Sequence, residues 1–268
     1  MTQPLILVTN DDGIASQGLW AAVEALLPLG ELLVVAPDRQ WSGAGRAMLH
    51  TVTGRVTEAG REINGRRITA YAVDATPAQA VIHGLTEFAP RRPSLVVSGI
   101  NYGENISTEV SVSGTVGAAL EAAASGIPAL AVSLAMPMHF YLTEGENRAV
   151  DYTTAAASTQ HFGRLLLQKT LPYAVDTLNV NIPWKANLGT PWRLTRLSRQ
   201  RYFLPLAPDR DNGHGRPGFK LLDDPAQAEP DSDVWALRIE KVISVTPISL
   251  DMTSPADFGA LEERLRAM

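Results

Sequence analysis

The sequence predicts a doubly wound, Rossmann-like α/β fold with a mostly parallel central sheet. Three observations carry this prediction. Short apolar runs, typical of buried parallel strands, recur along the first half of the chain. Segments with helical spacing of apolar residues separate these runs. Each run ends in a polar or glycine-containing loop, and such folds bind ligands at the carboxyl ends of their strands.

The first strand and its loop are the most informative stretch. Residues 5–8 are apolar, and Asn10, Asp11, Asp12 and Gly13 follow at once. Two adjacent carboxylates repel each other unless a positive charge lies between them, and a hard divalent cation prefers such oxygen ligands. Helix capping explains these residues equally well when they are taken alone, because Asn and Asp are good caps.

The next elements continue the alternation. A helix is expected over about residues 16–29, capped by Ser16, and a second buried strand over residues 32–35. Strand, helix and strand in this order imply a right-handed crossover and parallel pairing. The loops after both strands therefore open on the same edge of the sheet, and the second loop, residues 37–45, contains Ser42.

Residues 47–73 differ from the core pattern, because they alternate and contain the hairpin signal Asn64-Gly65. We therefore expect an antiparallel excursion from the core there. Thr76 and Pro77 then have the pattern of a capping box with proline at the first helical position, which predicts the start of another helix.

A third core strand is expected over residues 95–97, and its polar loop contains Asn101. Ser113, Gly114 and Thr115 then open an alanine-rich helix. The start of this helix offers backbone N–H groups and hydroxyls to an anion. Ordinary capping would explain the two hydroxyl residues if they stood alone, but a cation site beside them favours binding of a phosphate group.

The alternation weakens after about residue 135. We expect one α/β domain, residues 1–268, made of a core part, residues 1–135, and a C-terminal part, residues 136–268. The elements expected in the C-terminal part are helices over 148–169 and 255–267, strands over 178–181 and 242–246, a helix start within 232–237, and a long hairpin or lid within 199–232.

Composition excludes several classes of function. The net charge of −5 argues against broad binding of nucleic acid through phosphate contacts. The absence of cysteine excludes disulfides, thiolate zinc sites and a cysteine nucleophile, and the five histidines show no zinc-type spacing. No apolar run reaches the length of a membrane span, and the first strand begins too early to leave room for a signal peptide. We therefore expect a cytoplasmic protein.

Oxygen ligands thus follow three core strands: Asp11 and Asp12, then Ser42, then Asn101. Carboxylates combined with neutral oxygens suit a hard cation, and the helix start at residues 113–115 suits a phosphate group. Together these features predict metal-assisted phosphoryl transfer or hydrolysis.

These residues lie in motifs that closely resemble those of the SurE (survival protein E) family. The matching segments are 9–13, 36–38 with 42–43, 76–77, 97–101 with 103, 113–119, 179–183 and 244–247. The resemblance implies a 5′-nucleotidase that hydrolyses nucleoside 5′-monophosphates with Mg²⁺ or Mn²⁺, and that also accepts 3′-nucleotides and short polyphosphate. It further implies a homodimer or homotetramer assembled through residues 199–232 and 250–268.

The resemblance also assigns roles to residues. The metal ligands that it implies are Asp11, Asp12, Ser42 and Asn101. The catalytic residues are Asp11 and Asp12, of which we expect Asp12 to lie nearest the attacking water. The residues expected at the phosphate group are Asn101, Ser113, Gly114 and Thr115.

The chain departs from the family pattern at two places. Gln79 and Ala80 stand where the family usually has aspartate and cysteine, and Gly-Glu-Asn-Ile-Ser at residues 103–107 replaces Gly-Ala-Asn-Leu-Gly. Glu104 is therefore expected to place an extra acid near the mouth of the site, where it would affect the preference for a nucleotide. Tyr102 could stack on the nucleobase, or it could have a role in the core or on the surface.

Other classes of protein fit these motifs less well. An aspartyl-phosphate phosphatase needs a nucleophilic aspartate two residues before a second one, whereas Asp11 and Asp12 are adjacent. A receiver-like signalling module without hydrolase activity also has an acidic pair after its first strand. It needs an aspartate after its third strand, where this chain has Ser98 and Gly99. A dinucleotide-binding fold is disfavoured because no Gly-x-Gly-x-x-Gly follows the first strand.

Overall fold

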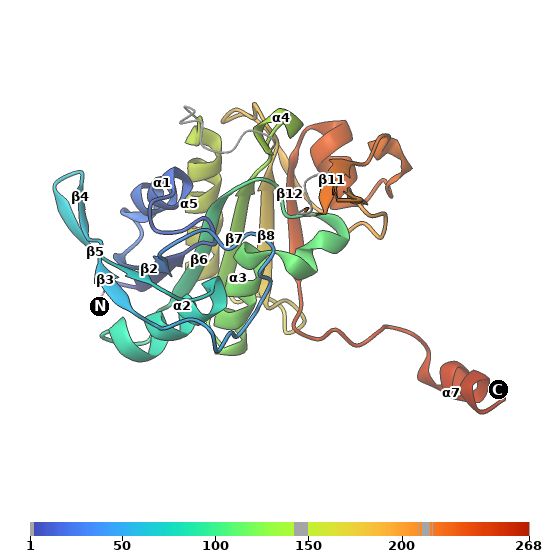
Figure 1. Cartoon of the computed structure of the whole chain (residues 1–268), viewed down its shortest axis with the longest axis horizontal. Helices are drawn as coiled ribbons and strands as arrows, with labels where there is room; N and C mark the ends of the chain where they lie inside the picture. Colours follow the sequence, from blue (N-terminus) through green and yellow to red (C-terminus); the bar gives the residue numbers. More distant parts are fainter. Residues whose placement is uncertain (1–2, 142–149, 209, 211–214, 216, 268) are drawn as a thin grey trace.

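The computed structural model describes residues 3–141, 150–208, 210, 215 and 217–267. Its centre is a ten-stranded sheet in the order β3-β5-β2-β1-β6-β7-β8-β12-β9, with β4 paired to β5 (Figure 1). The parallel core of this sheet is formed by β1 (Leu5–Thr9), β2 (Glu31–Pro37), β5 (Arg66–Val73), β6 (Leu95–Tyr102), β7 (Ala129–Leu134) and β8 (Thr177–Ile182).

Shorter strands extend both edges of this core. At one edge, β3 (Val56–Glu58) and β4 (Arg61–Ile63) pair antiparallel with β5. At the other edge, β12 (Ile243–Ile248) pairs antiparallel with β8, and β9 (Trp192–Leu194) pairs parallel with β12. A separate antiparallel hairpin consists of β10 (Phe203–Leu206) and β11 (Gly218–Leu221). The C-terminal part thus contributes strands to the same sheet as the core part.

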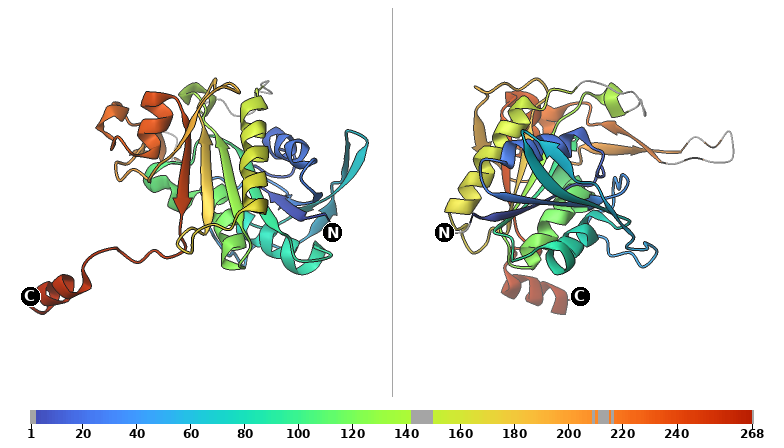
Figure 2. Two further views of the ribbon diagram at one scale, coloured as in Figure 1. Left: turned by 180° about the vertical axis from the view of Figure 1, so that it is seen from behind. Right: turned by 90° about the vertical axis from the view of Figure 1, so that its left-hand side faces the viewer.

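Helices cover both faces of the sheet. One face is covered by α1 (Gln17–Leu26) and α5 (Thr153–Gln168), which lie side by side in the left view of Figure 2. The other face is covered by α2 (Pro77–His83), its π-helical extension η1 (Gly84–Phe88) and α3 (Gly114–Ala124). Each layer buries its own apolar cluster against the strands, as Leu19 and Phe162 do on the first face and Val81 and Ala118 on the second. The predicted doubly wound architecture is confirmed.

Several local predictions are confirmed in detail. Ser16 caps α1, where its hydroxyl accepts a hydrogen bond from the Leu19 N–H at 3.4 Å. Thr76 and Gln79 form the expected reciprocal capping box at the start of α2. Asn64 and Gly65 make the turn between β4 and β5 with φ values of 50° and 73°, as a tight hairpin requires.

Other expectations were wrong in part. Residues 47–73 are not only an antiparallel excursion, because β5 also pairs parallel with β2 and so belongs to the core. The alternation of buried and exposed residues in β5, which lies near the sheet edge, concealed that pairing. β6 runs on to Tyr102, so Asn101 lies at the end of a strand rather than in a loop. The helix expected over 148–169 forms as Thr153–Gln168, while residues 148 and 149 lie outside the described residues.

Short segments complete the structure. They are η2 (Ser107–Val112), α4 (Met138–Tyr141), η3 (Pro225–Gln227), α6 (Asp233–Trp235), η4 (Ala236–Glu240) and α7 (Phe258–Arg266). After β12 the chain leaves the body and ends in α7, which Figure 1 shows set apart from the sheet. Residues 251–267 are all exposed. Among the described helices, none is both long and apolar enough to pass through a membrane.

Candidate metal and phosphate site

Three strand ends and one helix start meet at the carboxyl edge of the sheet. The loop after β1 is joined to the loop after β2, because the Trp41 N–H donates to the Asp11 carbonyl at 2.7 Å. The second loop is joined to the segment before α3, because the Gly45 N–H donates to the Val112 carbonyl at 2.8 Å. This approach needs glycine at position 117, since a Cβ on Gly117 would lie 2.3 Å from the Gly45 carbonyl oxygen.

Asp11 is buried against the first turn of α3. Its Oδ1 accepts a hydrogen bond of 2.6 Å from the Thr115 hydroxyl, and its side chain is also hydrogen-bonded by the backbone of Gly114 and Thr115. A Cβ on Gly114 would lie only 2.8 Å from the Asp11 Oδ2. Glycine at position 114 therefore lets this carboxylate reach the positive end of the helix, where an anion is stabilised.

Asp12 is half-buried and is held from two other segments. Its Oδ2 accepts a hydrogen bond of 2.9 Å from the Tyr102 N–H at the end of β6. Its Oδ1 accepts a longer one, 3.5 Å, from Gln40 Nε2, which also donates to the Ser42 Oγ at 2.9 Å. One side-chain amide thus links the second loop to the acidic pair. Sequence reasoning missed Gln40, and its only signal was its place two residues before Ser42.

The two carboxylates destabilise each other's charged form. Burial raises the pKa of Asp11, although its hydrogen bonds from Thr115 and Gly114 act in the opposite direction. Burial, and then the Asp11 charge, raise the pKa of Asp12 to about 7. The nearby Arg39 forms ion pairs with Asp38 and Asp74. Among the described residues, no cationic side chain pairs with Asp11 or Asp12.

The donor set fits a hard cation. Two side-by-side carboxylates without a cationic partner would be relieved by a divalent ion, and the neighbouring donors are hydroxyl and amide oxygens. The described part of the chain holds no group of three or more His, Asp or Glu side chains arranged for a metal. A site here would therefore have to combine the acidic pair with neutral oxygens, as the sequence predicts.

The remaining expected residues lie around the pair. Asn101 donates its Nδ2 to the Gly103 carbonyl at 2.7 Å, which leaves Oδ1 as the end of the amide that can accept or ligate. Ser113 caps α3, because its Oγ accepts from the Val116 N–H at 3.1 Å. The Thr115 hydroxyl donates to Asp11, so of the two hydroxyls at this helix start only that of Ser113 keeps its proton for another acceptor.

Glu104 does not lie at the mouth of the site. Its side chain is fully buried and forms an ion pair with Arg238 of η4. The expectation of an extra acid facing the substrate was therefore wrong. The sequence showed that an acid replaces the usual small residue, but the basic partner is distant in the chain and could not be found from spacing.

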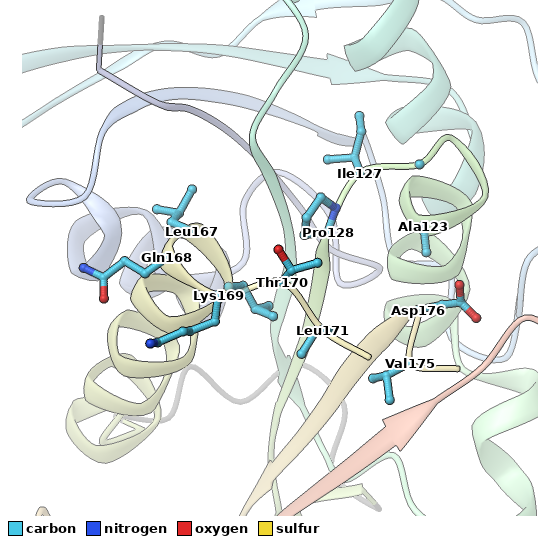
Figure 3. A pocket seen from close by; sticks show the side chains of 12 residues that line it. Ala123, Ile127, Pro128, Leu167, Gln168, Lys169, Thr170, Leu171, Val175 and Asp176 are labelled. Carbon is cyan, nitrogen blue, oxygen red and sulfur yellow. The ribbon is translucent and has the colours of Figure 1, made fainter. Parts of the chain in front are cut away.

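A surface groove lies at the opposite edge of the sheet (Figure 3). It is lined by Ala123 at the end of α3, by residues 126–128, which lead into β7, and by residues 166–171 and 175–176, which run from the end of α5 to the start of β8. These segments lie at the amino ends of the parallel strands. The groove therefore has no part in the acidic site, which lies at the carboxyl ends.

The fold and this edge define a class: a doubly wound α/β protein with an acidic pair and a helix start at the carboxyl ends of its strands. The sequence profile of the family described as Survival protein SurE matches residues 6–203. The chain belongs to the SurE family.

Relatives match it over nearly their whole length. The chain is 46% identical to a protein named 5′-nucleotidase SurE from Thermococcus gammatolerans, over 97% of this chain and 95% of that protein. It is 43% identical to the protein of the same name from Thermococcus kodakarensis, over 98% of each. The crystal structure of the SurE protein from Aquifex aeolicus is similar with a TM-score of 0.72 and 30% identity, over 98% of this chain and 99% of that one.

Proposed function

We propose that this chain is a metal-dependent 5′-nucleotidase, which hydrolyses nucleoside 5′-monophosphates to nucleoside and phosphate. The observation that carries the proposal is the acidic pair, Asp11 and Asp12, which no described cationic side chain neutralises. Its position beside the start of α3 suits a phosphate group next to a cation. The relatives named 5′-nucleotidase SurE support the same activity.

The residues proposed to hold the cation, Mg²⁺ or Mn²⁺, are Asp11, Asp12, Ser42 and Asn101. When bound, the cation would neutralise phosphoryl charge and acidify a bound water. Asp11 is fixed by Thr115 and suits the role of a firm ligand. Asp12 is less buried, and we assign to its carboxylate the orientation of the attacking water.

The phosphate group is assigned to the space between Asn101 and the residues Ser113, Gly114 and Thr115. The Thr115 hydroxyl donates its proton to Asp11, whereas the Ser113 Oγ only accepts in the cap and can still donate its proton to a phosphate oxygen. The N–H groups of the first turn are themselves engaged, those of Gly114 and Thr115 with Asp11 and that of Val116 with Ser113, so the helix start would act on the phosphate through its dipole. Thr115 would act through Asp11 as well.

Wider properties are proposed on the same family basis. They are activity on 3′-nucleotides and short polyphosphate, a cytoplasmic location, no binding of nucleic acid or membrane, and assembly into a homodimer or homotetramer. Assembly would use residues 199–232 and 250–268. The right view of Figure 2 shows the β10–β11 hairpin pointing away from the sheet, and α7 exposes Phe258, Leu261 and Leu265 along one side.

Phosphate release from a panel of nucleoside monophosphates tests the function. We expect turnover that stops after exhaustive chelation and returns with Mn²⁺ or Mg²⁺, because the donor set holds only oxygens. Undiminished turnover after chelation would contradict the metal mechanism. Phosphate binding without any turnover would favour the receiver-like signalling module instead.

A further inference from the structure

The segment that follows Asn101 is tied down by buried polar groups. The Asn105 N–H donates to the Asn181 Oδ1 at 2.8 Å, and its side-chain Nδ2 donates to the Ser133 Oγ at 2.9 Å. Its carbonyl accepts from Asn179 Nδ2 at 2.8 Å. Since Ser133, Asn179 and Asn181 are all fully buried, residue 105 is anchored to β7 and β8.

Glu104, the residue before this anchor, is held by an interaction between two charges. Its Oε2 accepts a hydrogen bond of 3.1 Å from the Met136 N–H, and its Oε1 pairs with the Arg238 guanidinium. The exposed fractions are 0% for the Glu104 side chain and 16% for that of Arg238. The guanidinium also lies 5.1 Å from the centre of the buried Tyr202 ring. Arg238 is therefore held in place on both sides.

Burial makes this pair resistant to displacement. Separating the two groups would give up an attraction between charges in a poorly solvated place, which is unfavourable. A shift of Glu104 would thus be opposed by η4 of the C-terminal part. The position of Glu104 affects the acidic site because Tyr102 lies only two residues earlier in the chain. The Tyr102 N–H donates to the Asp12 Oδ2 at 2.9 Å.

We propose that the Glu104–Arg238 ion pair is a positioning device for the acidic site. It fixes residues 101–104, so that the Asn101 amide oxygen and the Tyr102 N–H are held in place before a cation arrives. The inference rests on the proposed function in one respect, the cation at the acidic pair. It gives the C-terminal part a role in the site although that part supplies none of the proposed ligands.

A purely structural role is the competing explanation, since buried ion pairs can often be replaced by apolar residues without loss of stability. The chain offers a matched control. Glu240 belongs to the same η4 segment as Arg238 and pairs with Arg193 at 2.8 Å. That pair joins η4 to β9 at the far edge of the sheet. Glu240→Gln therefore removes a charge from η4 without touching residues 101–104.

The affinity for Mn²⁺, measured by calorimetric titration of chelator-treated protein, is the readout, because it does not depend on turnover. We expect Arg238→Met and Glu104→Gln each to bind Mn²⁺ about 10-fold more weakly than wild type, the loss typical of groups that orient metal ligands. Arg238→Lys keeps the charge and is expected to recover most of this affinity. Glu240→Gln is expected to bind Mn²⁺ like wild type.

A single variant can fail to fold because it leaves one buried charge without its partner. The double variant Glu104→Gln with Arg238→Met therefore decides the question. We expect it to melt near wild type in chelator and still to bind Mn²⁺ about 10-fold more weakly. Wild-type affinity in the double variant would overturn the proposal. So would its failure to fold, or an equal loss in Glu240→Gln, because each would mark a general structural role. A wild-type protein that binds no Mn²⁺ would refute the metal site itself.

Discussion

At the scale of single residues, the acidic pair is strained unless a cation lies beside it. Burial raises the pKa of both Asp11 and Asp12, and the charge of Asp11 raises that of Asp12 further. Two unit charges about 4 Å apart repel by about 4 kcal/mol at an effective dielectric constant of about 20, before solvent screening. The structure thus keeps two carboxylates where folding alone would favour fewer charges.

Asp12→Asn separates a cation site from a helix cap. The change removes one charge and keeps the shape, so the metal-free variant should melt at or above the temperature of metal-free wild type while losing nearly all activity. Mn²⁺ should raise the melting temperature of wild type by mass action and barely move that of the variant. Thermal melts with chelator and with Mn²⁺ measure both effects. If the variant is less stable than wild type in chelator and still responds fully to Mn²⁺, the acidic pair is a helix cap and not a cation site.

At the scale of elements, Asp233 joins three segments. Its carboxylate accepts backbone N–H bonds from Ser107 at 2.7 Å, Ser198 at 3.0 Å and Val234 at 2.8 Å. Burial nevertheless raises the pKa of Asp233 to about 6, although these N–H groups act in the opposite direction. One side chain thus holds together the start of η2, the chain before β10 and the start of α6. Its ionised form is disfavoured by burial.

The pH dependence of stability tests this junction. The pKa of Asp233 is about 6 in the folded protein and near 3.8 in the unfolded chain, so the folded state binds its proton more tightly. The stability gained from this protonation is fully present below about pH 4 and is lost as the pH rises through 6. A shift of about two pH units corresponds to about 3 kcal/mol. The unfolding free energy of Asp233→Asn should therefore fall less than that of wild type between pH 4 and pH 7. Parallel curves for the two proteins in urea melts would contradict this.

At the scale of the whole molecule, the body and the tail are different kinds of structure. The body buries apolar clusters on both faces of one continuous sheet. The tail over residues 251–267 is exposed throughout, and α7 leaves Phe258 and Leu265 exposed by 62% and 63%. An amphipathic helix with an uncovered apolar side is poorly stable alone in water, so it suits contact with another copy of the chain.

Truncation after Leu250 tests the role of the tail. Because residues 251–267 are exposed, their removal should change the unfolding free energy of the body by less than about 1 kcal/mol. Since α7 is proposed to contribute to assembly, the same change should also lower the number of chains per particle in solution. Light scattering and urea melts of the two proteins measure these outcomes. An unchanged number of chains per particle would show that the tail is not part of the proposed interface.

The local elements were predictable where the chemistry is local. Ser16 and Thr76 mark helix starts by side chains that cap the helix they precede, and Asn64-Gly65 marks a turn by its backbone preferences. The end of β6 was predicted less well, because the pairing register shifts between Ser98 and Asn101. β9 has only three residues, which is too short for any periodic pattern to be recognised.

The sequence by itself determined the fold class and the candidate ligands, because apolar periodicity and polar strand ends are written in consecutive residues. Only the tertiary structure decided which groups orient those ligands. Gln40 reaches Asp12, and Thr115 reaches Asp11 rather than solvent, across separations of 28 and 104 residues. Glu104 lies inside the protein against Arg238, 134 residues away, instead of at the mouth of the site. Such pairings depend on which chain segments the sheet brings together, and local spacing carries no record of them.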